Sequence, residues 1–136
     1  MVGTEKGDGM KNTTLFIIDD EKGIRMMLKE VFERTGYNVF TYANPFDAKM
    51  AINEKNPALI LVDYRIPEMK GDQFAHVIQE EGFRIPVILM SGADKEEMHD
   101  KIHSDAIVEI VEKPFNILDI IQIVEQNLYD FVNISE

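Results

Sequence analysis

The residues best suited to chemistry in this sequence are carboxylates that follow apolar segments. The run "TTLFIIDDE" places Asp19 and Asp20 directly after four apolar residues, and "ALILVD" ends at Asp63. Adjacent carboxylates at the end of a buried segment repel one another unless their pKa values rise or a cation lies between them. Among cations, Mg²⁺ best matches an all-oxygen ligand set with room for water, and Mn²⁺ comes next.

Two further apolar segments end in residues that would complement such a site. "PVILMS" ends at Ser91, and Lys113 closely follows "IVEIV". A hard cation, an ammonium, a hydroxyl and several carboxylates can together stabilise a transferring phosphoryl group, because that reaction depends on positioning and charge neutralisation. The nucleophile would be a carboxylate, a serine or a histidine. No histidine ends such a segment, so Asp63 and Ser91 are the candidates.

These residues converge only if the segments that carry them form one parallel sheet. The chain alternates apolar runs with amphipathic segments from Leu15 onward. We predict strands at 14–19, 37–42, 58–63, 86–91 and 107–111, a helix of about 15 residues after the first strand, and helices at 44–56, 71–82, 94–104 and 116–132. This alternation predicts an α/β fold with a five-stranded parallel sheet, doubly wound and flavodoxin-like, in the order 2-1-3-4-5. Ligands bind such sheets at the carboxyl ends of the strands.

Capping residues mark several helix ends. Gly36 is expected just past the end of the first helix, and Glu21 is expected in its first turn as an ordinary acid. Asn44 and Asn116 are expected as N-caps of the second and last helices. The apolar face of the first helix is expected to contain Ile24, Leu28, Val31 and Phe32.

Length and composition limit the class of protein. The chain has 136 residues, of which 45% are hydrophobic, so it is long enough for one globular domain. We expect a disordered N-terminal arm at 1–12, one domain at 13–131 and a C-terminal tail at 132–136. No apolar run approaches the roughly 20 residues that span a bilayer, and no signal peptide is evident, so we expect no membrane insertion and a cytoplasmic location. The absence of cysteine excludes disulfides and thiol catalysis.

The formal net charge of −11 argues against direct binding to nucleic acid, which requires clustered lysines and arginines. The same charge suits a cation or a basic partner, although many cytoplasmic proteins are simply acidic. His99 and His103 are spaced to share one helix face and could bind a metal. No third ligand is evident, so we expect an exposed polar helix there.

At the four strand ends, the sequence resembles the receiver domain of two-component response regulators. The motifs that carry this resemblance are "FIIDDE", "LILVDYRIPEMKG", "VILMSG" and "VEKPF", and it covers about residues 13–130. Each motif alone is weak, but four in the right order are specific. The stretch "DDEKGIRMMLKEVFERTGY" is also similar to single-domain phosphorelay intermediaries of the sporulation type.

The resemblance implies a Mg²⁺-dependent phosphoacceptor in a signalling domain, not an enzyme acting on a separate substrate. Asp63 matches the residue that accepts a phosphoryl group from the phosphohistidine of a histidine kinase or a phosphotransfer protein. Asp20 matches the direct Mg²⁺ ligand, and Asp19 matches the acid that holds the ion through water. The backbone carbonyl of Arg65 matches a further ligand. The family also implies self-catalysed phosphotransfer, slow autodephosphorylation and a conformational change read by a downstream protein, which the sequence does not identify.

Other residues match the machinery around the phosphoacceptor. Ser91 matches the switch hydroxyl, and Lys113 matches the partner of a phosphoryl oxygen, with a cis bond to Pro114. Pro67 and Gly71 match the turn that opens the third helix.

The sequence departs from the family at Ile110, where an aromatic residue or histidine usually stands three positions before the lysine. A smaller rearrangement, or a different output surface, is therefore implied. Glu112, beside Lys113, would pair with a partner or face solvent.

Three other functions compete with this reading. A degenerate receiver would act as a protein-interaction module without phosphorylation, and the intact site argues against it. A flavin-binding electron carrier of the same topology would need a Ser/Thr/Gly-rich loop where "DDEKG" stands. A hydrolase with a phosphoaspartate intermediate typically uses an Asp-x-Asp pair, whereas Asp63 is followed by Tyr64 and Arg65.

Overall fold

The computed structural model describes residues 12–102 and 104–135, so the predicted N-terminal arm lies outside it except for Asn12. The strands are β1 (Thr14–Ile18), β2 (Asn38–Tyr42), β3 (Leu59–Asp63), β4 (Val87–Ser91) and β5 (Ile107–Glu112). The helices are α2 (Lys22–Thr35), α3 (Pro45–Lys55), α4 (Gly71–Glu80), α5 (Lys95–Lys101) and α6 (Ile117–Ser135). The strands form one parallel sheet in the order β2-β1-β3-β4-β5, which confirms the predicted fold.

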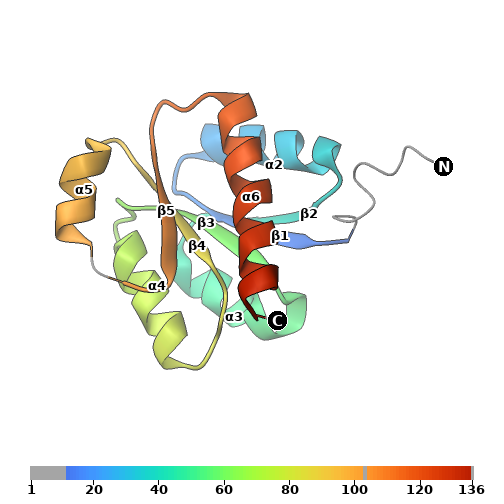
Figure 1. The fold of residues 1–136 in the computed structure, drawn as a ribbon, viewed down its shortest axis with the longest axis horizontal. Helices are drawn as coiled ribbons and strands as arrows, with labels where there is room; N and C mark the ends of the chain where they lie inside the picture. The colour runs from blue at the N-terminus through green and yellow to red at the C-terminus, as the bar shows by residue number, and fades with distance from the viewer. Residues whose placement is uncertain (1–11, 103, 136) are drawn as a thin grey trace.

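Helices cover both faces of the sheet, which explains why its strands are continuous apolar runs (Figure 1). Successive strand residues point to opposite faces. One face, with Phe16 and Val62, packs against buried residues of α3, α4 and α5. The other face, with Ile17 and Leu61, packs against buried residues of α2 and α6. The two layers hold the carboxyl ends of the strands along one edge.

The predicted caps fix where the helices begin and end. Gly36 adopts a left-handed conformation with φ of 112° at the end of α2. The Asn44 side chain accepts a hydrogen bond from the Asp47 amide at 2.9 Å, as expected of the N-cap of α3. The Asn116 side chain accepts hydrogen bonds from the amides of Leu118 and Asp119, both in the first turn of α6, at 2.9 and 3.2 Å.

Several boundaries differ from the predicted ones. β1 ends at Ile18, so Asp19 lies in the loop beyond it. α4 ends two residues early, because Gly82 takes a φ of 96° that the helix cannot accommodate. α5 ends at Lys101, because Ile102 is already extended toward β5. α6 continues to Ser135, so residues 133–135, predicted to lie in a tail, are helical; the sequence has no glycine or proline there to end the helix.

None of the helices in the described ranges combines the length and apolar character needed to cross a bilayer.

Candidate functional site

The register of the sheet brings the predicted site residues to one level. Ile18 of β1 pairs with Val62 of β3. The strands are parallel, so the residues that follow this pair, Asp19 and Asp63, lie side by side. On the other side of β3, Ser91 of β4 pairs with Glu112 of β5. Lys113 therefore lies directly after the end of β5, next to Ser91. The prediction that the carboxyl ends of the strands gather these groups is confirmed by this arrangement.

Three carboxylates and one ammonium form the centre of the cluster. Asp19, Asp20 and Asp63 each offer a carboxylate oxygen within 4.8 Å of the others. The Lys113 ammonium lies 2.8 Å from Asp63 Oδ1 and 2.9 Å from Asp19 Oδ2, so it bridges the two buried carboxylates. Asp19 is fully buried and Asp63 is 7% exposed, whereas Asp20 faces solvent.

Asp19 is held through every one of its polar groups. Its amide donates to the Tyr42 carbonyl at 3.1 Å, and its own carbonyl accepts from Arg25 Nη1 at 2.7 Å. Its Oδ1 accepts from the Glu21 amide at 2.9 Å, and its Oδ2 accepts from Lys113. No described residue hydrogen-bonds the Asp20 carboxylate, which leaves both of its oxygens available to a ligand.

Burial and mutual charge set the protonation of this cluster. Burial raises the pKa of Asp19; the Glu21 amide and Lys113 oppose that rise, and the Asp63 charge adds to it. Burial alone would lower the pKa of Lys113, but its hydrogen bonds to Asp63 and Asp19 outweigh burial and raise it. Lys113 therefore remains an ammonium at neutral pH. Three carboxylates and one ammonium leave an excess of negative charge, and an all-oxygen set of this kind fits Mg²⁺.

The main chain around Asp63 is packed too tightly for any side chain at Gly71. A Cβ at Gly71 would lie 2.7 Å from the Asp63 carbonyl oxygen and 2.6 Å from Leu89 Cδ1. The Gly71 amide also donates to the Tyr64 carbonyl at 3.0 Å. Gly71 thus lets α4 begin directly against the strand end that carries Asp63, which gives a physical reason for the predicted turn.

Arg65 contacts the site through its backbone amide, which donates to Asp63 Oδ2 at 3.1 Å. Its side chain is exposed. The expectation that the Arg65 carbonyl binds the cation stays a prediction, because the interactions of the described residues do not involve that oxygen.

Ser91 is buried at the end of β4, and its hydroxyl is turned into the following loop. Its Oγ accepts a hydrogen bond from the Ala93 amide at 3.0 Å. Its carbonyl accepts from the Lys113 amide at 2.8 Å, which links the end of β4 to the lysine. The Lys113–Pro114 peptide bond is cis, as the resemblance implies.

Two acids near the site make contacts that were not predicted: Glu21 lies one residue earlier than expected, whereas Glu112 is exposed, as one of its two predicted roles requires. Glu21 was expected in the first helical turn, but it precedes α2 as the N-cap residue, and its carboxylate lies 3.6 Å from the Lys113 ammonium. Glu112 accepts a hydrogen bond from the Lys95 amide at 2.6 Å and so binds the start of α5. Neither contact follows from local sequence, because each joins residues whose proximity only the folded chain creates.

Arg25 is a further residue that sequence reasoning missed. Its guanidinium reaches back from α2 to the Asp19 carbonyl. The available signal was a cation near the N-terminus of a helix, where the helix dipole disfavours positive charge.

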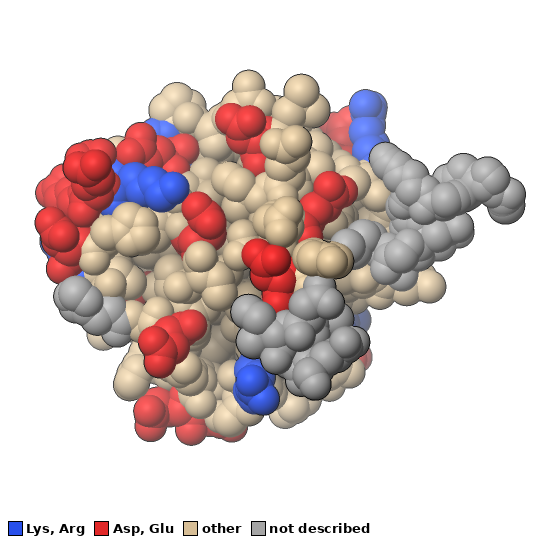
Figure 2. All heavy atoms as spheres, in the orientation of Figure 1, with Lys and Arg blue, Asp and Glu red and all other residues tan. Residues whose placement is uncertain are grey.

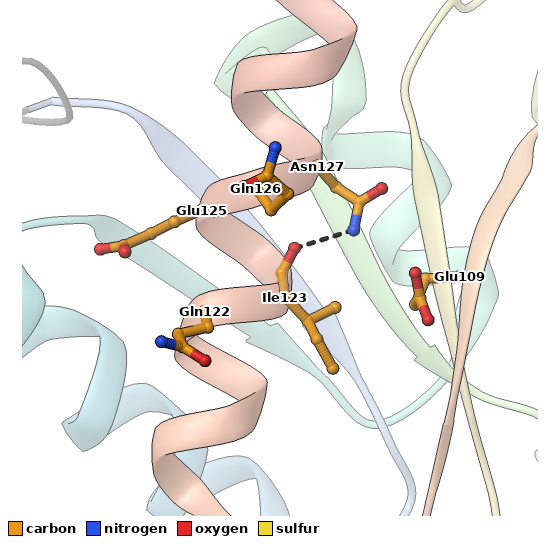
Figure 3. Close-up of a pocket in the computed structure, with 6 residues that line it drawn as sticks. All are labelled: Glu109, Gln122, Ile123, Glu125, Gln126 and Asn127. Atoms are coloured by element: carbon orange, nitrogen blue, oxygen red, sulfur yellow. Dashed lines mark hydrogen bonds between the residues drawn. The ribbon is translucent and has the colours of Figure 1, made fainter.

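A second hollow of the described surface lies apart from the predicted site residues. Figure 3 shows a hollow between β5 and α6, lined by Glu109, Gln122, Ile123, Glu125, Gln126 and Asn127. It contains none of the predicted site residues. His99 is exposed on α5 as expected, while His103 lies outside the described residues.

Comparison with known proteins agrees with this geometry. The profile of the response regulator receiver domain matches residues 15–125. Sporulation initiation phosphotransferase F of Bacillus subtilis is 32% identical over 119 residues, which cover 88% of this chain and 96% of that protein. The DNA-binding transcriptional regulator NtrC of Proteus hauseri is 25% identical, and the match covers 86% of this chain but 25% of that longer protein.

Solved structures show the same likeness. The receiver domain protein of Methanospirillum hungatei superposes with a TM-score of 0.82 at 20% identity, covering 90% of this chain and 98% of that one. The response regulator TrrA of Thermotoga maritima, in complex with Mg²⁺–BeF, superposes with a TM-score of 0.75 at 26% identity, covering 84% of this chain and 97% of that one. The profile match, together with the 32% identity to a protein that this chain covers almost entirely, shows that the chain belongs to the family of response regulator receiver domains.

Proposed function

We propose that this receiver accepts a phosphoryl group on Asp63 from the phosphohistidine of a histidine kinase or a phosphotransfer protein. The observation that carries the proposal is the Lys113 ammonium, which lies 2.8 Å from Asp63 Oδ1 and also bridges to Asp19. A fixed positive charge beside the attacking carboxylate stabilises the negative charge of the phosphoryl oxygens during transfer. The likeness to a sporulation phosphotransferase supports this reading.

The transfer requires one new bond and one broken bond. A carboxylate oxygen of Asp63 attacks phosphorus, and the bond between phosphorus and the histidine nitrogen breaks as the new P–O bond forms. The electron pair of the broken bond stays on the ring nitrogen that held phosphorus. The proton on the other ring nitrogen of the phosphohistidine remains in place, so the imidazole leaves as the neutral base. Lys113 pairs with a phosphoryl oxygen, and the Ser91 hydroxyl hydrogen-bonds another after leaving the Ala93 amide.

The carboxylates beside Asp63 would hold Mg²⁺, with Mn²⁺ as a substitute. Asp20, whose oxygens are unengaged by described residues, would bind the ion directly, and Asp63 would share it. Asp19, whose two oxygens already accept hydrogen bonds, would hold the ion through water, and the Arg65 carbonyl would complete the set. A bound divalent cation supplies further neutralisation of the phosphoryl oxygens. The Mg²⁺–BeF complex of TrrA supports this assignment.

Phosphorylation would be signalled through the loop between β4 and α5. That loop is closed by the Ser91–Ala93 hydrogen bond, which the switch hydroxyl must give up. Ile110 is 3% exposed and packs in the same apolar cluster as Met98 of α5. A shift of the loop would therefore reach a downstream partner through repacking around Ile110 rather than through rotation of an aromatic ring.

The proposal is tested by intact-mass spectrometry after incubation with acetyl phosphate. We expect the wild type to gain one phosphoryl group with Mg²⁺ present and none with excess chelator. The Asp63→Asn variant should gain none under either condition. Labelling of that variant, or labelling in chelator, would contradict the assignment of Asp63 or of the cation.

The same measurement separates this function from that of a degenerate receiver. A protein-interaction module would stay unlabelled even with Mg²⁺ and a phosphohistidine donor.

A further inference from the structure

We infer that Arg25 is a positioning residue for the cation site, acting through the backbone carbonyl of Asp19. The inference rests on the proposed function, because it concerns the cation that Asp20 and Asp63 would hold. Arg25 Nη1 donates to the Asp19 carbonyl at 2.7 Å from the beginning of α2. The guanidinium thus contacts neither Asp20 nor Asp63, the two proposed direct ligands. It contacts the main chain at Asp19, between β1 and Asp20.

The contact fixes the peptide group from which Asp20 departs. A peptide unit is planar, so holding the Asp19 carbonyl also sets the direction of the Asp20 amide and of the chain that follows it. Among the described residues, Asp20 itself has no side-chain hydrogen bond that would place its carboxylate. The Asp19 side chain is held separately by the Glu21 amide and Lys113. Arg25 therefore orients the peptide link that leads into Asp20, while the Asp19 side chain holds the Glu21 amide on the other side of Asp20.

The position of Arg25 on its helix supports a specific role. Its amide donates to the Glu21 carbonyl, so Arg25 belongs to the first hydrogen-bonded turn of α2. That turn contains no acid, and a cation there is disfavoured by the helix dipole. Arg25 is half-buried, and its bond to a carbonyl is charge-assisted, which offsets this cost. If Arg25 only kept this face of α2 soluble, its guanidinium would not need to reach the Asp19 carbonyl in the loop after β1.

Two effects of removing Arg25 have opposite signs, which makes the inference testable. Loss of a positive charge near three carboxylates would, by itself, strengthen Mg²⁺ binding. Loss of positioning would weaken it, since removal of residues that orient metal ligands typically costs 10–100-fold in affinity. We expect positioning to dominate, so that Arg25→Gln weakens Mg²⁺ binding by about tenfold.

Lys22→Gln is the matched control. Lys22 is an exposed cation at the first residue of the same helix, with no hydrogen bond or ion pair to a described residue. Its removal changes the charge near the site without touching the Asp19 carbonyl. We expect this variant to bind Mg²⁺ as tightly as the wild type, or slightly more tightly.

The experiment is a calorimetric titration of each full-length variant with Mg²⁺, accompanied by amide hydrogen exchange without the ion. Arg25→Gln should also speed exchange at Asp20 and Glu21 relative to Lys22→Gln. Arg25→Met, which keeps the packing of the side-chain stem, serves if the glutamine variant does not fold. A folded Arg25 variant that binds Mg²⁺ as tightly as the wild type would overturn the inference. A wild type that binds no Mg²⁺ would instead contradict the proposed function, and this inference with it.

Discussion

Asp19 is the residue at which stability and function conflict most directly. It is fully buried, and its burial raises the pKa of its carboxyl group. A raised pKa means that the folded chain favours the neutral acid, so an ionised Asp19 lowers the stability of the folded state at neutral pH. The buried charge of Asp19, directly after the apolar strand β1, is therefore not required for the stability of the fold.

Replacement of Asp19 by asparagine should stabilise the chain when Mg²⁺ is absent. Asn keeps an oxygen for the Glu21 amide and removes the buried charge, so we expect the melting temperature at pH 7 to rise by about 4 °C. The stability contributed by a group with a raised pKa is present below its ordinary value, 3.8 for Asp19, and is lost as the pH rises through the higher value of the folded state. The difference between the two proteins should therefore shrink as the pH falls toward 3.8.

Differential scanning calorimetry over a pH series checks this expectation. Asp20→Asn is the control, because that carboxylate is exposed and its neutralisation should change the melting temperature less. An Asp19→Asn variant less stable than the wild type at pH 7 would show that the bond to Lys113 outweighs the burial of the charge.

At the scale of elements, the junction between β3 and α4 controls the placement of Asp63. Gly71→Ala should destabilise the chain by about 1–3 kcal/mol and slow phosphorylation, because the new methyl group would press on the Asp63 carbonyl and on Leu89. Gly23→Ala in the first turn of α2 is the matched control. No atom lies within 4 Å of a Cβ at Gly23, and alanine favours a helix over glycine, so that variant should be as stable as the wild type or more stable.

Chemical denaturation and the rate of labelling by acetyl phosphate measure the two effects separately. Equal behaviour of the two glycine variants would mean that α4 can shift without disturbing Asp63.

The start of α5 depends on a residue from another element. Asp94, its N-cap residue, makes no side-chain capping bond, and Glu112 of β5 instead accepts from the Lys95 amide at 2.6 Å. Glu112→Gln should weaken this bond, because a neutral amide oxygen is a poorer acceptor than a carboxylate. We expect faster amide hydrogen exchange at the N-terminal turn of α5, measured by mass spectrometry with residue-level resolution.

Glu97→Gln controls for the loss of a negative charge near the same helix end, since Glu97 is an exposed residue of that turn. Exchange that rises equally in both variants would assign the effect to the helix dipole rather than to the Glu112 hydrogen bond.

The sequence was sufficient for the features that depend on periodicity and strand ends. Apolar runs located β1 and β3, and the common strand order placed Asp19 beside Asp63. It was insufficient for contacts between segments. The bond from Arg25 to Asp19 and the bond from Lys95 to Glu112 depend on how far a side chain reaches in the folded chain. Helix ends such as that of α6 were also misplaced, because the sequence offers no breaker at the point where the helix was expected to end.

At the scale of the whole molecule, the net charge of −11 means that any cation will interact with the surface. Acidic side chains gather at the left of Figure 2, over α5, and surround a smaller group of basic atoms. Screening of this general repulsion by salt stabilises a compact state without any specific site. Stabilisation by Mg²⁺ is therefore evidence for the proposed site only if it exceeds this screening.

We expect Mg²⁺ to stabilise the wild type more than NaCl does at equal ionic strength, and to lose that advantage in Asp20→Asn. A ligand at ten times its dissociation constant stabilises the folded state by about 1.4 kcal/mol, whereas screening acts on both proteins alike. Asp20 is exposed and hydrogen-bonds no described residue, so its replacement should change the Mg²⁺ response with little effect on the fold itself. Melting temperatures of both proteins in matched MgCl₂ and NaCl series provide the measurement. If the two salts stabilise the wild type equally, Mg²⁺ acts through the acidic surface as a whole and not through the carboxylates at the end of β1 and β3.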